Sequence, residues 1–439
     1  MFPQRRTVTL IIIAAIALKA LLLLVVIPEL FLLSPSSYQI EFFPDRYDEI
    51  AQNLIDGHGY RIYLDTSLTM LRMPGFTLAL AGLFWLFGHS LVAVKMFNLV
   101  CSVLAAWGVY VLGRDVTGDK RIGALSAFIS FFYPAAILAE SRGGLESLLS
   151  LSFVVTMLLT YRALRSNAWR DFAFAGLSFG FILLIKSSAA LFPPLLFAAM
   201  FAARRTWAGF WNAFGRVFVF GIVSLLVLAP WVWRNYQISH AFVPTMTSGG
   251  VAAFQGLYVV SHWGNGREHF QLIDDASAQQ EVVARQMGLR FHHEFFQQFY
   301  SPNDELEFSN RLGQLARQQL KDDPTLLLRA VLFNLRGFWI GGRTAQATMM
   351  NTIVVTPFLL LLAAGCYLAW RRRLWVSPLL LFSFGFMAAH LPIIGVARYH
   401  VSLIPLLSIL AALGLAALPD LMRGASGPRH HGPLSGKAA

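Results

Sequence analysis

The stretch that decides the fold is Phe172–Ala203, which reads FAFAGLSFGFILLIKSSAALFPPLLFAAMFAA and carries one charge, Lys186, in 32 residues. As a single helix it would be about 48 Å long, well beyond the hydrocarbon core of a bilayer, which is about 30 Å thick. Basic side chains flank both ends: Arg165, Arg170, Arg204 and Arg205. Because short basic flanks stay on the cytoplasmic side, the stretch predicts two spans joined by an outer hairpin turn near Lys186-Ser187-Ser188.

The composition of the whole chain is typical of a membrane protein. Of its 439 residues, 56% are apolar and 13% are charged, against roughly 25% charged in an average soluble domain. This excludes a disordered chain, a coiled coil and a disulfide scaffold. The two cysteines, Cys101 and Cys366, lie in apolar runs. The net charge of +12 indicates basic cytoplasmic loops and nearby anionic lipid rather than nucleic acid.

Ten apolar runs predict membrane spans. They lie at about 9–33, 91–112, 122–139, 145–160, 172–186, 189–203, 217–233, 351–370, 376–395 and 400–418. The first follows Arg5 and Arg6, so we interpret it as an uncleaved signal anchor with the N-terminus inside. A further run, Pro74 to Phe87, has about 14 residues, which suits a re-entrant or interfacial helix. The predicted fold is all-α, a polytopic membrane protein of about ten transmembrane helices.

These spans divide the chain into four parts. Residues 1–233 form a core transmembrane module whose first outer loop is 34–90. Residues 234–350 form an outer cap, in which patterns at about 276–299, 304–321 and 325–338 predict amphipathic helices. Residues 351–418 are C-terminal transmembrane helices. Residues 419–439 include a Gly/Pro/His-rich tail that we expect to be disordered in the cytoplasm.

The first outer loop contains the clearest candidate for chemistry. Tyr47, Ile50, Ala51 and Leu54 recur at helical spacing and predict an amphipathic helix, with Asp45 just ahead of it at the N-cap. Two interpretations of Asp45 stay open. It is either a helix cap, since Asp is a favoured N-cap residue, or a carboxylate at the membrane surface that acts as general base on an acceptor hydroxyl.

Four groups of motifs follow one another along the chain. They are Asp45, Tyr47 with Ala51, Gly57-His58-Gly59-Tyr60 and Arg72-Met73-Pro74-Gly75-Phe76; Pro134 with Glu146; Ala229-Pro230-Trp231-Val232-Trp233-Arg234-Asn235-Tyr236 with Ser248-Gly249-Gly250; and Arg398-Tyr399 with Pro405. In these motifs the sequence resembles the GT-C superfamily of membrane glycosyltransferases. Within it, the resemblance is to the branch that holds the aminoarabinose transferases and protein O-mannosyltransferases.

The resemblance implies a sugar donor on a polyprenyl phosphate, which meets its acceptor in a cavity at the outer membrane face. It also implies that Asp45 is the catalytic carboxylate, although Asp48 or Glu49 could take that place. A second acid is expected from the next outer turn, where we prefer Glu140 to the deeper Glu146. The residues expected to bind substrate are Asp48, Tyr60, Arg72, Glu146, Lys186, Arg234, Asn235, Arg398 and Tyr399.

The expected reaction is an inverting displacement at the anomeric carbon. Asp45 would activate the acceptor hydroxyl. The cations Arg72, Lys186 and Arg398 would stabilise the departing polyprenyl phosphate, although each alone would also serve as an anchor at the lipid headgroups. No cofactor is demanded. Asp45 with Glu140 offers oxygen ligands for one divalent cation.

The expected partners are a polyprenyl-phosphate-sugar donor, a lipid, glycan or protein acceptor, and membrane lipid, without nucleic acid. The expected location is the bacterial cytoplasmic (inner) membrane, as a multi-pass protein whose active site faces the periplasm. The alternative is a transporter or flippase of a lipid-linked glycan. That function predicts charged or broken helices near the midplane and internal repeats, whereas the charges noted here lie near one face.

Overall fold

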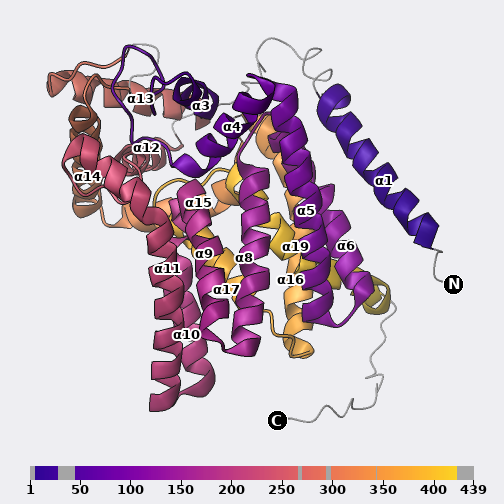
Figure 1. Cartoon of the computed structure of the whole chain (residues 1–439). Helices are drawn as coiled ribbons and strands as arrows, with labels where there is room; N and C mark the ends of the chain where they lie inside the picture. Colours follow the sequence, from indigo (N-terminus) through magenta and orange to yellow (C-terminus); the bar gives the residue numbers. More distant parts are fainter. Residues whose placement is uncertain (1–4, 28–44, 265–268, 293–297, 343, 423–439) are drawn as a thin grey trace.

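Helices make up most of the computed structural model, which describes residues 5–27, 45–264, 269–292, 298–342 and 344–422. Within these residues the β pairing is limited to one bridge, between Phe291 and Phe299. Long helices stand side by side as a bundle, and a group of shorter helices covers one end of it (Figure 1). The prediction of an all-α polytopic membrane protein is confirmed.

The bundle contains α1 (Arg5–Leu21) with η1 (Leu22–Val26), α5 (Leu91–Thr117), α6 (Lys120–Phe131), α7 (Pro134–Ser141), α8 (Glu146–Ser166), α9 (Trp169–Ile185), η3 (Ser187–Leu191), α10 (Phe192–Arg204), α11 (Trp207–Ser239), α16 (Ala345–Arg371), α17 (Ser377–His390) and α19 (Ile404–Met422). The other helices are α3 (Tyr47–Ile55), α4 (Pro74–Phe87), α12 (Ser248–His262), α13 (His269–Gln286), α14 (Pro302–Asp322), α15 (Thr325–Ile340) and α18 (Arg398–Val401). Each of the ten segments predicted to span the membrane is mostly helical in its described residues, with non-helical breaks at 132–133, 391–395 and 402–403.

Five helices in the described part of the chain are long and apolar enough to cross a membrane: Thr7–Val26, Leu91–Thr117, Glu146–Ser166, Trp207–Ser239 and Ala345–Arg371. The pair α6 and α7 passes the same test together but is bent by 45°. Pro134 begins α7, and a proline has no N–H with which to continue a helix. The chain is therefore an integral multi-pass membrane protein, while the total of ten spans stays a prediction.

The predicted hairpin turn lies where α9 ends. Lys186 has an extended backbone (φ −149°, ψ 101°) and leads through η3 into α10. On its other side α4 lies against the same helix end, since a Cβ on Gly75 would be 2.8 Å from the Leu184 carbonyl oxygen. The absence of a side chain at Gly75 thus lets the first outer loop sit directly beside Lys186.

Two expectations for the outer part are wrong in detail. The helix predicted at 276–299 is α13, which ends at Gln286 shortly before Gly288 adopts the left-handed region (φ +68°). Helix α12 was not predicted. The patterns at 304–321 and 325–338 correspond to α14 and α15. Residues 34–44 of the first loop and 423–439 of the expected tail lie outside the described residues.

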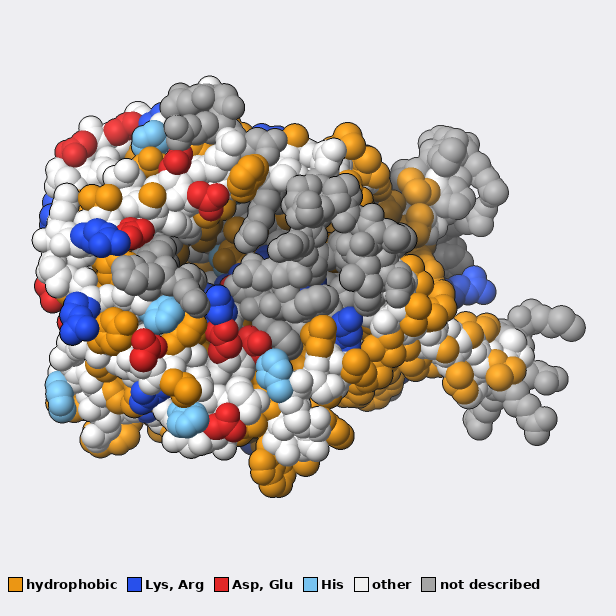
Figure 2. Space-filling view, turned by 90° about the horizontal axis from the view of Figure 1, so that it is seen from above, with side chains coloured by type: hydrophobic (Ala, Val, Ile, Leu, Met, Phe, Trp, Pro, Cys, Tyr) orange, Lys and Arg blue, Asp and Glu red, His pale blue; other side chains and the backbone are white. Residues whose placement is uncertain are grey.

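Charged and hydrophobic side chains are distributed unequally over the covered end of the bundle (Figure 2). Seen from above, Lys, Arg, Asp, Glu and His side chains gather over the side where α12, α13 and α14 lie, and hydrophobic side chains dominate the side of α1 and α5 (Figure 2). Buried apolar residues of α12 and α14, including Phe254, Leu257, Phe308 and Leu312, form a separate small core. The polar end therefore has its own packed structure above the first outer loop.

Candidate active site

Asp45 is held by two arginines that come from distant parts of the chain. Its Oδ2 lies 2.8 Å from Arg398 Nη1, and its Oδ1 accepts a hydrogen bond from Arg398 Nη2 at 3.0 Å. Arg72 Nη2 lies 3.6 Å from Oδ1, and Arg72 Nε donates to the Asp45 carbonyl at 3.1 Å. The two parallel contacts of Arg398 with the two carboxylate oxygens form a bidentate ion pair, which is a strong kind of side-chain interaction.

The charges around Asp45 decide its protonation. Burial raises the pKa of this carboxyl, but the positive charges of Arg398 and Arg72 outweigh burial and hold the pKa below its usual range. Lys186 acts in the same direction. Asp45 is therefore ionised throughout the neutral pH range.

The expectation that Asp45 caps helix α3 is wrong. The N-cap position of α3 is Arg46, which has a left-handed backbone (φ 60°, ψ 28°) and no capping hydrogen bond from its side chain. The Asp45 carboxylate instead points to Arg398 and Arg72. The paired bonds from Arg398, together with the nearby charge of Arg72, outnumber the single backbone N–H that a cap would offer, so tertiary contacts prevail over the local cap.

Lys186 and Tyr399 lie beside this pair. Lys186 Nζ is 4.2 Å from the centre of the Tyr399 ring, which places the ammonium over the aromatic face. Lys186, Arg398 and Tyr399 share a pocket with Glu146, the first residue of α8. Burial raises the pKa of Tyr399, but the charges of Lys186 and Arg398 outweigh burial, so the pKa of the phenol is lowered. Both cations thus face the same small space.

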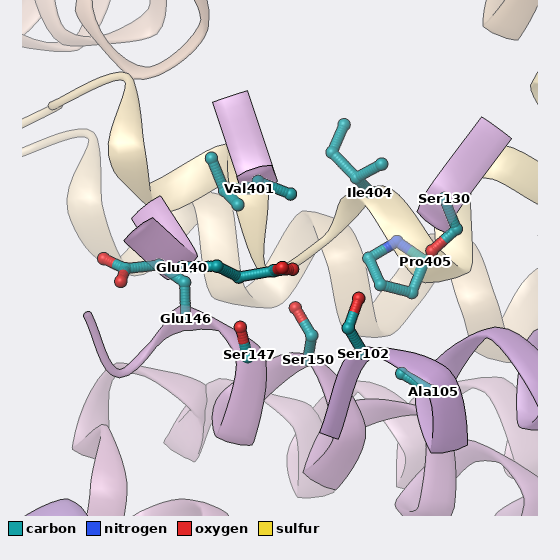
Figure 3. Close-up of a pocket in the computed structure, with 11 residues that line it drawn as sticks. Ser102, Ala105, Ser130, Glu140, Glu146, Ser147, Ser150, Val401, Ile404 and Pro405 are labelled. Atoms are coloured by element: carbon teal, nitrogen blue, oxygen red, sulfur yellow. The ribbon is translucent and has the colours of Figure 1, made fainter. Parts of the chain in front are cut away.

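The two candidate second acids point in different directions. Both line a pocket whose other polar residues are Ser102, Ser130, Ser147 and Ser150. In Figure 3 the Glu140 carboxylate points toward Ser102 and Pro405, whereas that of Glu146 points away from them. The Glu146 carboxylate instead interacts with the charges of Arg398 and Lys186. Glu146, rather than Glu140, therefore belongs to the Asp45 cluster.

Glu140 has a partner that the sequence analysis did not identify. Lys19 of α1 lies 2.9 Å from Glu140 Oε1, and both side chains are buried. Lys19 Nζ also donates to Ser102 Oγ at 2.5 Å. The signal was available, because an ionisable residue inside an apolar span usually faces a partner or a cavity.

Three residues predicted to bind substrate are engaged elsewhere. The Tyr60 hydroxyl is within 3.2 Å of the carbonyl oxygens of Arg72 and Met73. Arg234 Nη1 donates to the Thr69 carbonyl at 2.8 Å, and Asn235 Nδ2 donates to the Val243 carbonyl at 3.0 Å. Each of them fixes a loop beside the cluster rather than extending the cluster itself.

Two other acids of the first loop, Asp48 and Glu49, pair with groups outside the cluster. Asp48 Oδ2 lies 3.4 Å from His89 Nε2, and Glu49 forms an ion pair with Arg46. Among Asp45, Asp48 and Glu49, Asp45 is the one that contacts Arg72 and Arg398. In the described part of the chain, no group of three or more His, Cys, Asp or Glu side chains is placed to hold a metal ion.

Residues 72–233 match the family model described as dolichyl-phosphate-mannose-protein mannosyltransferase. Over this segment the chain is similar to that family. The matched segment contains Arg72, Glu146 and Lys186, whereas Asp45 and Arg398 lie outside it.

A solved structure similar to this chain is that of ArnT from Cupriavidus metallidurans, bound to undecaprenyl phosphate. The two chains are 14% identical, with a TM-score of 0.43, and the similarity covers 96% of this chain and 79% of the other. No curated protein matches the sequence.

Proposed function

We propose that this protein transfers a sugar from a polyprenyl-phosphate-linked donor to an acceptor hydroxyl at the outer face of the membrane, with inversion at the anomeric carbon. The observation that carries the proposal is the Asp45 carboxylate held between Arg398 and Arg72, next to the pocket of Lys186 and Tyr399. The matching family is named for a polyprenyl-phosphate sugar donor, dolichyl-phosphate-mannose, which supports the same class of donor here.

The charges of the cluster suit a phosphate. Arg72, Lys186 and Arg398 contribute three positive charges, while Asp45 and Glu146 contribute at most two negative ones. The surplus of positive charge favours a bound anion. Guanidinium groups bind phosphate oxygens through paired hydrogen bonds, and a lysine contributes a compact charge. Sugar transfer leaves behind a polyprenyl phosphate, so the same cations stabilise the leaving group as its charge develops.

Asp45 takes the role of the base or orienting group. A carboxylate paired with two arginines is a weak base, which suits a hydrogen bond to an acceptor hydroxyl more than removal of its proton in advance. When the donor phosphate binds Arg72 and Arg398, it competes for their donors and makes Asp45 more basic. The proton then passes to Asp45 as the acceptor oxygen bonds to the anomeric carbon and the phosphate departs.

Glu146 is the better second acid for this reaction. It lies in the pocket of Lys186, Arg398 and Tyr399, where it can accept hydrogen bonds from hydroxyl groups of a bound sugar. Glu140 is neutralised by Lys19, which suits a structural role. The distribution of arginines in the short loops supports a location of the cluster at the outer end of the helices, and on this basis we assign the reaction to the periplasmic face of a bacterial cytoplasmic membrane.

The test uses purified protein in liposomes with a labelled polyprenyl-phosphate sugar and a panel of lipid, glycan and protein acceptors. Glycoside formation and release of polyprenyl phosphate are both measured. Asp45→Asn should slow transfer by about 100-fold or more. Asp56→Asn, which changes an exposed acid at the end of α3, should keep the wild-type rate.

Two results would contradict the proposal. Equal rates for Asp45→Asn and the wild type would remove Asp45 from the catalytic role. Movement of labelled donor between leaflets without formation of a glycosidic bond would instead identify a flippase.

A further inference from the structure

A buried carboxylate outside the Asp45 cluster lies where the outer cap meets the first outer loop. Glu305 belongs to the first turn of α14, and only 3% of its surface is exposed. Its Oε2 accepts a hydrogen bond from Thr69 Oγ1 at 2.7 Å, and its Oε1 accepts one from the Met70 N–H at 2.9 Å. The hydroxyl of Thr247 also donates to Oε1. Donors from two separate loops therefore converge on one side chain.

These bonds hold a short segment, residues 69–73, that is not helical. The Thr69 N–H donates to the Tyr60 carbonyl at 2.9 Å, and the Thr247 N–H donates to the Met70 carbonyl at 3.1 Å. The Thr69 carbonyl in turn accepts from Arg234 Nη1 at 2.8 Å. Because no helical ladder orders this segment, contacts with other elements determine its position.

Arg72 lies in the same segment, two residues beyond Met70. Its backbone carbonyl is 3.2 Å from the Tyr60 hydroxyl, and its guanidinium contacts both the carbonyl and the carboxylate of Asp45. A continuous set of contacts therefore runs from Glu305 through Thr69 and Met70 to Arg72 and Asp45. A shift of the segment would move the guanidinium relative to the carboxylate.

The chemistry of Glu305 points to positioning rather than to packing. A buried carboxylate costs free energy unless hydrogen bonds compensate it, and an apolar side chain would fill the same space at lower cost. Directional bonds to backbone and hydroxyl groups are useful where a segment must be held in one place. Displacement of a reacting group by about 1 Å can slow a reaction by about 100-fold.

We propose that Glu305 is a positioning residue for the sugar transfer: it ties the cap to residues 69–73 and so sets where Arg72 meets Asp45 and the donor phosphate. This inference rests on the proposed function. It gives the outer cap a part in catalysis, although no cap residue belongs to the Asp45 cluster described above.

The first test does not depend on activity. Wild-type protein and the variants Glu305→Ala, Glu305→Gln and Glu307→Ala are placed in nanodiscs and compared by hydrogen exchange of the peptide that covers residues 69–73. Glu305→Ala should speed exchange there because the Met70 N–H loses its acceptor. Glu305→Gln keeps one carbonyl oxygen and should change exchange little. Glu307, exposed on the same helix, is the control. Unchanged exchange in Glu305→Ala would overturn the proposal.

The second test measures transfer in liposomes. Glu305→Ala should lower kcat by about 10-fold or more, and Glu305→Gln should recover most of that loss, whereas Glu307→Ala should keep the wild-type rate. Thr69→Val removes the hydroxyl that donates to Glu305 Oε2 and should also lower kcat. If Glu305→Ala does not fold, the Thr69→Val result decides. A wild-type kcat in Thr69→Val would then overturn the proposal.

A double-mutant cycle separates positioning from general destabilisation. If Glu305 acts through Arg72, Glu305→Ala should cost less than about threefold in an Arg72→Lys background, because coupled residues are not additive. The full 10-fold loss in that background would overturn the proposal. Inactive wild-type protein would instead count against the proposed function, while the exchange result would still decide the role of Glu305.

Discussion

The Asp45 carboxylate lies 2.8 Å from Arg398 Nη1 and 3.0 Å from Arg398 Nη2 along a second contact, although 353 residues separate the two in sequence. One residue precedes the first helix of the outer loop, and the other opens the short helix α18 before the last long helix. This ion pair joins the first outer loop to the segment just before the last long helix. The site therefore forms only when these two segments have packed against each other.

Arg398 should therefore be the most sensitive cation of the site. Arg398→Gln removes the fork that orients Asp45 and one positive charge for the phosphate, and should lower kcat/KM by about 100-fold or more. Arg398→Lys keeps the charge without the paired donors and should retain more activity than Arg398→Gln. Steady-state transfer in liposomes measures both. Equal losses for Lys and Gln would show that the fork geometry is unimportant.

The pH dependence of transfer should change when Arg72 is removed. The pKa of Asp45 lies below its usual value because the arginine charges outweigh burial. The ionised form therefore persists until the pH falls through that lowered pKa, below about pH 4. Arg72→Gln removes one of these charges, raises the pKa of Asp45 and should move the acid limb of the kcat/KM profile to higher pH. An unchanged or lowered limb would contradict this assignment.

Lys186 should act mainly on the donor. Its ammonium lies over the Tyr399 ring in the pocket shared with Arg398. Lys186→Met should raise KM for the donor by about 10-fold, since one charge–phosphate contact is lost. Lys186→Arg should restore much of the affinity. Binding of labelled polyprenyl phosphate to protein in nanodiscs checks the result directly, and Lys120→Met, an exposed lysine at the start of α6, serves as control.

Substitutions of the two candidates for the second acid, Glu146 and Glu140, should have different effects on the rate of transfer. Glu146→Gln should slow transfer by 10-fold or more, because Glu146 shares the pocket of Arg398 and Lys186. Glu140→Gln should affect the rate less, because Glu140 pairs with Lys19. Rates measured at saturating donor distinguish a chemical role from a weaker binding role. The opposite order of losses would restore Glu140 as the second acid.

Lys19 should matter for stability rather than for chemistry. Lys19→Met leaves the Glu140 carboxylate buried without its cation, and breaking a buried ion pair typically costs about 3–5 kcal/mol. Thermal unfolding in nanodiscs should therefore show a clearly lowered Tm. Lys19→Met combined with Glu140→Gln removes both charges and should recover most of the loss. If the double variant is no more stable than Lys19→Met, the pair is not the source of the effect.

Much of this protein could be predicted from its sequence, because the bilayer imposes simple rules on the chain. Apolar runs of the required length located the helices, and basic flanks at Arg204 and Arg205 decided that Phe172–Ala203 is a hairpin. The short apolar run from Pro74 to Phe87 correctly predicted helix α4. Spacing and motif order also singled out Asp45, Arg72, Lys186 and Arg398, although they are scattered along the chain.

Tertiary structure decided the partners. Local pattern left Asp45 open between a helix cap and a catalytic carboxylate, whereas packing brings its carboxylate to the guanidinium groups of Arg398 and Arg72. Packing also gives the two glutamates different partners. Glu140 pairs with Lys19 of α1, whereas Glu146 shares a pocket with Arg398 and Lys186. Glu305 carried no sequence signal, because its partners are backbone and hydroxyl groups of distant loops. Hydropathy and the charges of short loops are local properties of the sequence, so helices and topology can be predicted from them. The pairing of buried charges depends on which helices pack together, which the local sequence does not determine.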